Sequence, residues 1–405
     1  MRIVLISNWF SENVGYAENF LPRALADKGH EVHLVTSTAQ IYFRSKKYKT
    51  IYEPYLGPHI VEPCEKKIDS FSLHRFELLE LKRKFYDPLG LSGLTIKNLY
   101  NRLKILNPDV IQVFNVWDYS SFVAAKYCLD TGIKFFTESH IHSSVLRTSN
   151  RKGWREIFPP LLNNFRPSIK LINNQTILCY PISIDSAEIC KSVFKVPQEK
   201  IKIQSLGVDT NLFSPIASGL QNRNREVIRA NLGIPNNNIV IIYTGRFSID
   251  KSPHVLADAI DILHDRGYKN FSGLFVGTGT VEEISYLKRK KGCIVHPFVL
   301  VNELPDFYRA VDIGVWPREE STSQLDAVAC GLPIIISDKV SVTERVEGNG
   351  LFYKEGNSRD LADKILALSD AKTRRDFSLN GVKKVQQEYS WEAIANSRLS
   401  DYLSK

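Results

Sequence analysis

The fold prediction for this chain rests on one stretch, Ile239-Val240-Ile241-Ile242-Tyr243-Thr244-Gly245-Arg246-Phe247-Ser248-Ile249-Asp250-Lys251-Ser252-Pro253. Its first part is a continuous apolar run, which is typical of a strand buried on both faces of a parallel sheet. A glycine ends the run, and Pro253 favours the start of a helix because proline suits the first helical turn. The stretch therefore predicts a strand, a short loop and a helix, the repeating unit of an α/β protein.

The same alternation of apolar runs and helical patterns recurs on both sides of this stretch. It predicts parallel sheets with right-handed crossovers, and its two series predict an α/β fold of two Rossmann-like, doubly wound domains. We expect these domains to face each other across a cleft, with a joint near residues 213–224, where turn-forming words cluster. The predicted strands are 3–7, 31–36, 109–114, 133–137, 169–172 and 201–205 in the first half, and 239–244, 273–276, 293–296, 312–316 and 333–337 in the second.

The composition agrees with this class. The chain has 405 residues, 43% apolar and 24% charged, which is enough for two ordinary cores. We find no secretory signal, no membrane-spanning run and no metal or disulfide spacing among the six cysteines, which predicts a cytoplasmic protein. The net charge of +9 fits either a solvated basic surface or attraction to anionic ligands or membranes, and no nucleic-acid motif is present.

Two cations follow the strand of the opening stretch. Arg246 stands beside Gly245 in the loop, and Lys251 stands just before the predicted helix, so both can reach one anion near the end of the strand. Charge-assisted hydrogen bonds contribute roughly 1.5–3 kcal/mol each, and two of them suit a diphosphate. The alternative is a pair of exposed surface cations, which the adjacent glycine and the position after a strand disfavour.

A second constellation follows the strand predicted to end at Trp316. Acidic and hydroxyl residues come first, then a helix of small residues, then Gly331-Leu332-Pro333 and another strand. Asp326 falls early in that helix, where a carboxylate can accept hydrogen bonds from two vicinal ribose hydroxyls. Residues 321–324 can present backbone N–H groups to a phosphate, and the alternative is an ordinary helix with a Ser or Thr cap.

Weaker signals lie after three other predicted strands. Gly15 follows the first strand and precedes Tyr16 at the start of a helix, where a glycine lets the backbone approach a ligand. Gly277 ends a strand of the second half and fits a turn of close approach. His140 and His142 follow the strand at 133–137, although a lone histidine is more often structural.

Together these motifs resemble those of glycosyltransferase family 4, which has the GT-B fold of two Rossmann-like domains. The resemblance covers nearly the whole chain, and it depends on the order and spacing of motifs that are individually modest. The motifs are the Gly15 loop, 28–32 (KGHEV), 206–213 (LGVDTNLF), Gly245-Arg246 with Lys251, 276–279 (VGTG), 304–308 (LPDFY), 310–312 (AVD), 325–333, 347–352 (EGNGLF) and 389–391 (YSW).

The resemblance implies transfer of a sugar from a nucleotide diphosphate sugar with retention of anomeric configuration, and with neither a metal ion nor another cofactor. Arg246 and Lys251 match the pair that holds the donor diphosphate. His140 matches the histidine near the transferred sugar, with His142 as the second choice. Gly15 matches the loop that approaches the phosphates and the acceptor.

One motif departs from the family pattern. Asp326 matches the second glutamate of the Glu-x7-Glu motif, which binds ribose, but Arg318 occupies the position of the first glutamate. In the family that first carboxylate contacts the donor sugar, so either Glu319 or Glu320 takes its place or the contacts with the sugar differ. The departure affects the identity of the donor more than the class of reaction.

These observations predict a retaining hexosyltransferase-type enzyme that acts on a glycan or lipid-linked glycan acceptor, as in cell-surface polysaccharide assembly. The expected domains are 1–215 on the acceptor side and 216–387 on the donor side, with a helix at 388–405 packed back on the first. The predicted site residues are Arg246, Lys251 and His140 for catalysis; Gly15, Arg246, Lys251, Gly277, Glu319, Glu320, Ser323, Gln324, Leu325 and Asp326 for the donor; and Tyr16, His140 and His142 on the acceptor side.

Alternatives remain open for both the activity and the location. A degenerate, non-catalytic sugar-nucleotide-binding protein would fit Arg318, and a nucleotide-sugar epimerase would share the fold. A dinucleotide oxidoreductase is disfavoured because no full Gly-x-Gly-x-x-Gly follows the first strand.

Residues 42–49 and 146–158 mix basic and aromatic side chains, which fits either peripheral contact with the inner face of a membrane or a solvated loop. Salt-sensitive co-sedimentation with anionic vesicles would distinguish the two.

Overall fold

The computed structural model describes residues 1–12, 14–81, 92–141, 167–215, 218–318, 321–340 and 342–404. The chain divides into two compact units, of which the first comprises Met1–Ser205 and Ile394–Lys405 and the second comprises Leu206–Ala393. The sequence places the boundary later, between residues 215 and 216, and the segment 213–224 is not simply a joint. Much of it belongs to a helix, Ser218–Asn231.

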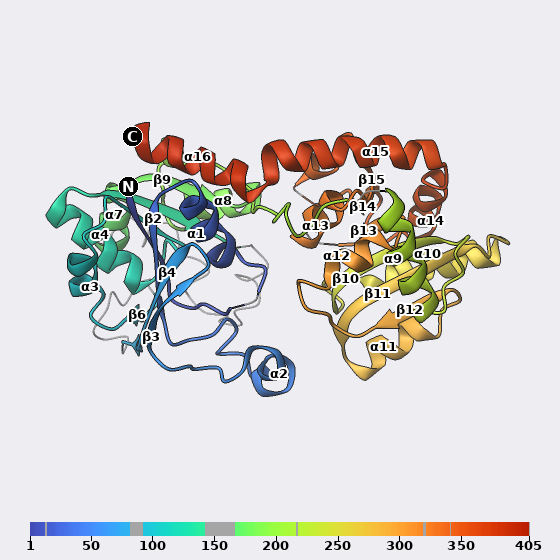
Figure 1. Ribbon diagram of the computed structural model, residues 1–405, viewed down its shortest axis with the longest axis horizontal. Helices are drawn as coiled ribbons and strands as arrows, with labels where there is room; N and C mark the ends of the chain where they lie inside the picture. Colours follow the sequence, from blue (N-terminus) through green and yellow to red (C-terminus); the bar gives the residue numbers. More distant parts are fainter. Residues whose placement is uncertain are drawn as a thin grey trace. The chain divides into compact units, whose positions relative to one another are not determined.

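The first unit is built on a seven-stranded sheet in the order β3-β4-β2-β1-β7-β8-β9 (Figure 1). Neighbouring strands are parallel except β3 and β4, and α1 packs on β2 and β4 while α4 packs on α3 and α7. Its elements are β1 (Arg2–Ser7), α1 (Ala17–Asp27), β2 (Glu31–Ser37), η1 (Tyr48–Tyr52), α2 (Glu53–Leu56), β3 (Cys64–Ile68), β4 (Phe71–Phe76), β5 (Leu78–Glu80), β6 (Leu94–Ile96), α3 (Leu99–Leu106), β7 (Val110–Val113), α4 (Tyr119–Thr131), β8 (Lys134–Ser139), α7 (Pro167–Gln175), β9 (Thr176–Pro181), α8 (Ile184–Ser192), η2 (Gln198–Lys200) and most of α16 (Trp391–Ser404).

The second unit is built on a six-stranded parallel sheet in the order β12-β11-β10-β13-β14-β15. Helix α10 packs against α11 and α14, whereas α12 packs against α9 and α13. Its elements are α9 (Ser218–Asn231), β10 (Ile239–Phe247), α10 (Pro253–Asp265), β11 (Phe271–Gly279), α11 (Val281–Lys288), β12 (Cys293–His296), α12 (Leu304–Arg309), β13 (Ile313–Trp316), α13 (Ser323–Ala329), β14 (Ile334–Ser337), η3 (Thr343–Arg345), β15 (Gly350–Tyr353), α14 (Ser358–Ala367), α15 (Ala371–Lys384) and η4 (Val385–Tyr389).

The apolar strands of both sheets form the cores. The apolar run at residues 239–243 lies in β10, where Val240, Ile241 and Ile242 are fully buried. Helix α10 begins at Pro253, as predicted, and buries its apolar face against the same sheet. The predicted α/β class with doubly wound parallel sheets is therefore confirmed.

Two of the predicted strands are wrong. Residues 169–172 belong to helix α7, where Ile169 and Ile172 share the buried face; a short apolar run does not by itself distinguish helix from strand. Residues 201–205 run beside β9, but their only bridge outside the named strands, among the residues the structure describes, joins Ile201 to Cys179. No helix in the described ranges is long and apolar enough to cross a membrane.

Candidate active site

The second unit has a topological switch point at β10. The chain places β11 on one side of this strand and β13 on the other, and doubly wound sheets bind ligands beyond the carboxyl ends of strands at such a point. Arg246 lies at the end of β10, and Asp326 lies in α13, the helix that follows β13. The two strongest sequence constellations are thus placed at one switch point.

Two glycines bring the ends of β10 and β11 unusually close. Gly245 and Gly277 are paired in the parallel ladder, with φ of 143° and 153°. A Cβ on Gly277 would lie 1.9 Å from the carbonyl oxygen of Gly245, a distance that no side chain tolerates. Gly277 was predicted as a donor-binding turn, and the structure shows that glycine is required there for backbone packing.

Arg246 and Lys251 both act on the carboxylate of Asp250. The Arg246 side chain is 65% exposed, and its guanidinium is 4.0 Å from Asp250. Burial raises the pKa of Asp250, but hydrogen bonding within the loop and the charges of Arg246 and Lys251 outweigh burial, so the net pKa is lowered. Both cations therefore act on the same small region, as the prediction of one shared anion requires.

Asp326 lies in a region of low dielectric at the start of α13. Its pKa is raised from 3.8 to about 8, mainly by burial and also by the negative charge of Asp209, against the opposing effect of Arg345. The neighbouring hydroxyls are also held firmly, because the Tyr308 and Thr244 oxygens are 2.8 Å apart. A carboxyl group with such a pKa is mostly protonated at neutral pH, and hydroxyl donors from a bound ribose would favour its ionised form.

The titration of Asp326 predicts a pH-dependent stability. The folded protein holds the Asp326 proton more tightly than the unfolded chain, so the free energy of unfolding should fall as pH rises from about 4 to about 8. The full shift corresponds to roughly 5–6 kcal/mol by linkage, and because solvent reaches part of the side chain we expect on the order of 2 kcal/mol.

Asp326→Asn should remove this dependence of stability on pH. The free energy of unfolding of the variant, relative to that of wild type, should therefore rise by on the order of 2 kcal/mol between about pH 4 and about pH 8. Urea unfolding at a series of pH values measures the difference. Asp376→Asn, at an exposed position of α15 in the same unit, is the matched control. A constant difference between Asp326→Asn and wild type across the pH range would contradict the assignment.

The remaining predicted donor residues around α13 are placed as follows. Gln324 is fully buried and accepts a 3.4 Å hydrogen bond from Arg345, which also donates to the Ser321 carbonyl. Gln324 thus supports the loop, and the buried Leu325 packs in the core. Ser323 is partly exposed and its hydroxyl interacts with Tyr308. Glu319 and Glu320 lie outside the described residues.

Arg318, at the position of the first motif glutamate, pairs with an acidic side chain. Its Nε lies 3.6 Å from the Glu355 carboxylate, which follows β15 and also accepts a hydrogen bond from Ser337. Arg318 is 46% exposed. A cation paired with Glu355 cannot supply the carboxylate that the family motif places here.

The first unit has its own switch point, between β1 and β7. Gly15 is exposed in the loop after β1, and Tyr16 is the N-cap residue of α1. The Tyr16 hydroxyl is 2.6 Å from the Tyr42 hydroxyl. Burial and the interaction with Tyr42 raise the pKa of Tyr16 well above its usual range, so Tyr16 acts as a neutral hydrogen-bonding group.

His140 follows β8 and is 26% exposed. Its Nε2 is 2.7 Å from Glu138 Oε1. Burial lowers the pKa of His140, but the hydrogen bond and charge of Glu138, together with the charge of Glu18, outweigh burial and raise it overall. His142 lies outside the described residues.

Several residues of these two sites were not among the sequence predictions. Glu138 had a detectable signal, because residues two apart on a strand share one face and His140 follows it at that spacing. Arg398 had no such signal, since 260 residues separate it from Glu138. The other missed neighbours are Glu18, Asp209, Thr244, Tyr308 and Arg345.

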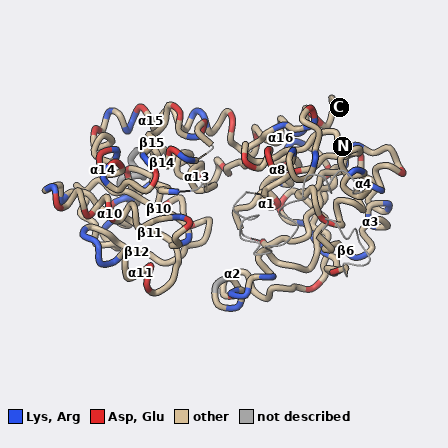
Figure 2. The backbone as a smooth tube through the Cα atoms, turned by 180° about the vertical axis from the view of Figure 1, so that it is seen from behind, with Lys and Arg blue, Asp and Glu red and all other residues tan. Residues whose placement is uncertain are grey.

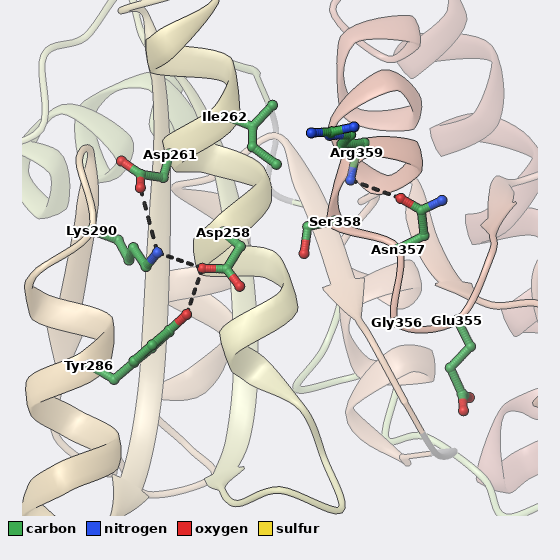
Figure 3. A pocket seen from close by; sticks show the side chains of 10 residues that line it. All are labelled: Asp258, Asp261, Ile262, Tyr286, Lys290, Glu355, Gly356, Asn357, Ser358 and Arg359. Atoms are coloured by element: carbon green, nitrogen blue, oxygen red, sulfur yellow. Dashed lines mark hydrogen bonds and ion pairs between the residues drawn. The ribbon is translucent and has the colours of Figure 1, made fainter.

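A cavity of about 670 Å³ in the second unit is lined by none of the predicted site residues. Figure 3 shows it between α10, α11 and the segment that follows β15. On one wall Lys290 pairs with Asp258 at 2.7 Å, and Tyr286 donates to the same carboxylate. Because these groups satisfy one another, the cavity gives no indication of a second catalytic centre.

Comparisons with known proteins show what this chain is similar to. Residues 238–371 match the family model described as Glycosyl transferases group 1. The chain is 27% identical over 231 residues to spore coat protein SA of Bacillus subtilis, covering 52% of this chain and 60% of that protein. It is 26% identical over 228 residues to D-inositol 3-phosphate glycosyltransferase of Xylanimonas cellulosilytica, covering 54% of each. The chain thus spans between about half and 60% of the length of these curated relatives.

The solved structures show the fold. Anabaena HepE in complex with UDP superposes with a TM-score of 0.67 at 18% identity, covering 100% of both chains, and the crystal structure of HepE with UDP-glucose gives 0.62 at 17%, covering 100% of this chain and 99% of that one. The fold is therefore GT-B. Over residues 238–371 the chain is similar to the group 1 glycosyltransferases.

Proposed function

We propose that this protein is a retaining, metal-independent glycosyltransferase that moves a sugar from a nucleotide diphosphate sugar to a glycan or lipid-linked glycan. One observation carries the proposal. Two cations, Arg246 and Lys251, act on one small region at the carboxyl end of β10. Asp326 lies in α13, the helix that follows the neighbouring strand β13, at the same switch point. The group 1 match over residues 238–371 covers all three residues.

The chemistry follows from the charges. Departure of a nucleotide diphosphate leaves negative charge on the β-phosphate, and Arg246 and Lys251 would stabilise that charge where it grows. Asp326 would accept hydrogen bonds from the ribose. The resemblance to glycosyltransferase family 4 implies attack on the face that the diphosphate leaves, with the departing phosphate helping to take the proton of the acceptor.

The acceptor is proposed from the first unit. Residues 42–49 carry the exposed cations Arg44, Lys46, Lys47 and Lys49, and Figure 2 shows Lys and Arg gathered in the segment that leads to α2. Tyr42 is 46% exposed and stacks on Tyr52 with ring centroids 4.6 Å apart. A basic segment with ordered aromatic rings fits an anionic lipid-linked acceptor at a membrane surface.

A panel of nucleotide sugars tests the proposed function. The matching donor should raise the melting temperature and should also be hydrolysed slowly, or transferred when an acceptor is supplied. At a donor concentration of about 100 times Kd the stabilisation is roughly 2.7 kcal/mol. Binding of no nucleotide sugar, measured by thermal shift and by calorimetry, would contradict the proposal.

A second candidate function, a sugar-nucleotide-binding protein without activity, is favoured by one observation. Arg318 is paired with Glu355 where the family places a carboxylate on the donor sugar. Such a protein would be stabilised by the nucleotide yet would neither transfer nor hydrolyse any donor. A nucleotide-sugar epimerase would instead convert the donor into a second nucleotide sugar, which chromatography of the reaction mixture detects.

A further inference from the structure

A chain of buried polar side chains lies behind His140 in the first unit. It joins the sheet to α16, the last helix, through the pair Glu138 and Arg398, whose side chains are 3% and 2% exposed. A buried charge without a partner is costly, and a buried pair persists only when its geometry and hydrogen bonds are good.

The two oxygens of Glu138 have different partners. Oε1 lies 2.7 Å from His140 Nε2. Oε2 accepts a 2.8 Å hydrogen bond from Gln112 Nε2 and a 3.1 Å hydrogen bond from Arg398 Nη2. The Tyr402 hydroxyl in turn donates to Gln112 Oε1 at 2.6 Å, which fixes the amide so that its nitrogen faces Glu138. With donors on both oxygens, Glu138 is held as a carboxylate.

Arg398 contributes a buried positive charge but does not use all of its hydrogen-bond donors. Its guanidinium carbon lies 3.2 Å from the centroid of the Tyr180 ring. Its Nε and Nη1 are buried with no hydrogen-bond partner among the residues that the structure describes. It forms an ion pair with Glu138, and its charge is the largest of the influences that lower the pKa of Glu138 against the effect of burial.

Among the residues that the structure describes, the charged groups that act on His140 are mostly acidic. Glu138 faces it from β8, and Glu18 faces it from α1, where Ser7 donates to the Glu18 carboxylate. Arg398 on α16 is the opposing cation, and Phe114, just after β7, presents an edge-to-face ring contact at 6.3 Å. Two acidic groups and one more distant cation favour the protonated imidazole.

We propose that Glu138 and Arg398 are positioning residues of the transfer reaction. Arg398 keeps Glu138 ionised, and the ionised Glu138 keeps His140 protonated. Because the Nε2–H of His140 donates to Glu138, its Nδ1–H is the remaining donor toward the substrate. This inference rests on the proposed function. In this arrangement His140 donates a hydrogen bond and positive charge, and it does not act as a general base.

The alternative role for the pair is to fasten α16 to the sheet. A purely structural pair would change the stability of the protein when mutated, but it would not change the titration of His140. The two roles are therefore separated by the ring signals of His140 in NMR spectra recorded across pH, which need no substrate. The signals are assigned with His140→Gln.

Glu138→Gln should lower the midpoint of the His140 titration by about one pH unit or more, since it removes the partner charge and hydrogen bond. Arg398→Met should shift the midpoint in the same direction, because Glu138 then takes a proton itself. Arg398→Lys retains the positive charge, so its His140 midpoint should stay close to that of wild type. Leu399→Ala, on α16 but outside this polar chain, should lower the melting temperature and leave the midpoint in place.

Either single variant leaves a buried charge unpaired, so the double variant Glu138→Gln with Arg398→Met is included to keep the fold. It should show the same lowered midpoint. With the matching donor, kcat of Glu138→Gln near pH 7 should fall about tenfold with little change in KM, and it should recover as pH is lowered. An unchanged His140 midpoint in the folded variants overturns the inference, even if wild type is active. A lowered midpoint supports the coupling, and if wild type then acts on no nucleotide sugar, only the proposed function fails.

Discussion

Replacing Arg246 by alanine is expected to lower turnover about a thousandfold while the protein stays folded. At about 4 Å and an effective dielectric near 20, two unit charges interact by about 4 kcal/mol. If that interaction is realised only as the diphosphate departs, it corresponds to about three decades in rate. Because the side chain is 65% exposed and its guanidinium lies 4.0 Å from the Asp250 carboxylate, its removal disturbs little packing.

The measurement is kcat with saturating donor, alongside the melting temperature. Arg289→Ala is the matched control, since it removes an exposed arginine from the same unit, at the end of α11. The control should retain normal turnover. Near-normal turnover of Arg246→Ala, with the control also normal, would rule out Arg246 as a group that stabilises the leaving diphosphate.

Gly277→Ala is expected to destabilise the second unit by about 3 kcal/mol or more. The new Cβ would lie 1.9 Å from the Gly245 carbonyl oxygen, and a φ of 153° is strained for any side chain. Since the obstructing atom is backbone, relief requires β10 and β11 to separate. Chemical denaturation of the purified variant gives the change in the free energy of unfolding.

The matched control for this substitution is Gly233→Ala. Gly233 also has a positive φ, 67°, but nothing lies within 4 Å of a Cβ built there. It should cost only the backbone penalty of about 1–2 kcal/mol. Equal losses for the two variants would mean that backbone strain, and not the contact between the strands, explains why a glycine stands at 277.

Much of the second unit could be predicted from the sequence, because its strands are continuous apolar runs bounded by glycine or proline. Cys293–His296 was predicted with the bounds of β12, and Pro253 marks the start of α10. The first unit was harder. Its edge strand β3 is largely exposed, and β4 alternates buried and half-buried residues, so neither gives the apolar run that identified the other strands.

The candidate site divides in the same way. Residues next to strand ends, such as Arg246 and Asp326, could be predicted from the sequence, because the order of strands and helices along the chain places them at a switch point. Their electrostatic environment could not be found. Asp209 and Arg345 act on Asp326 from segments far away in the sequence, and no local pattern records such a contact. The proposed pairing of each residue with phosphate or ribose stays a prediction.

The first unit is discontinuous in sequence, since it is completed by the residues after Ile394. During synthesis the ribosome therefore releases the entire second unit before it delivers Arg398 and Tyr402. Until then Glu138 has no guanidinium beside it and Gln112 has no tyrosine hydroxyl to orient it. The usual order, in which an N-terminal domain finishes folding before the next one is made, therefore does not hold for these contacts, which form only after α16 has been synthesised.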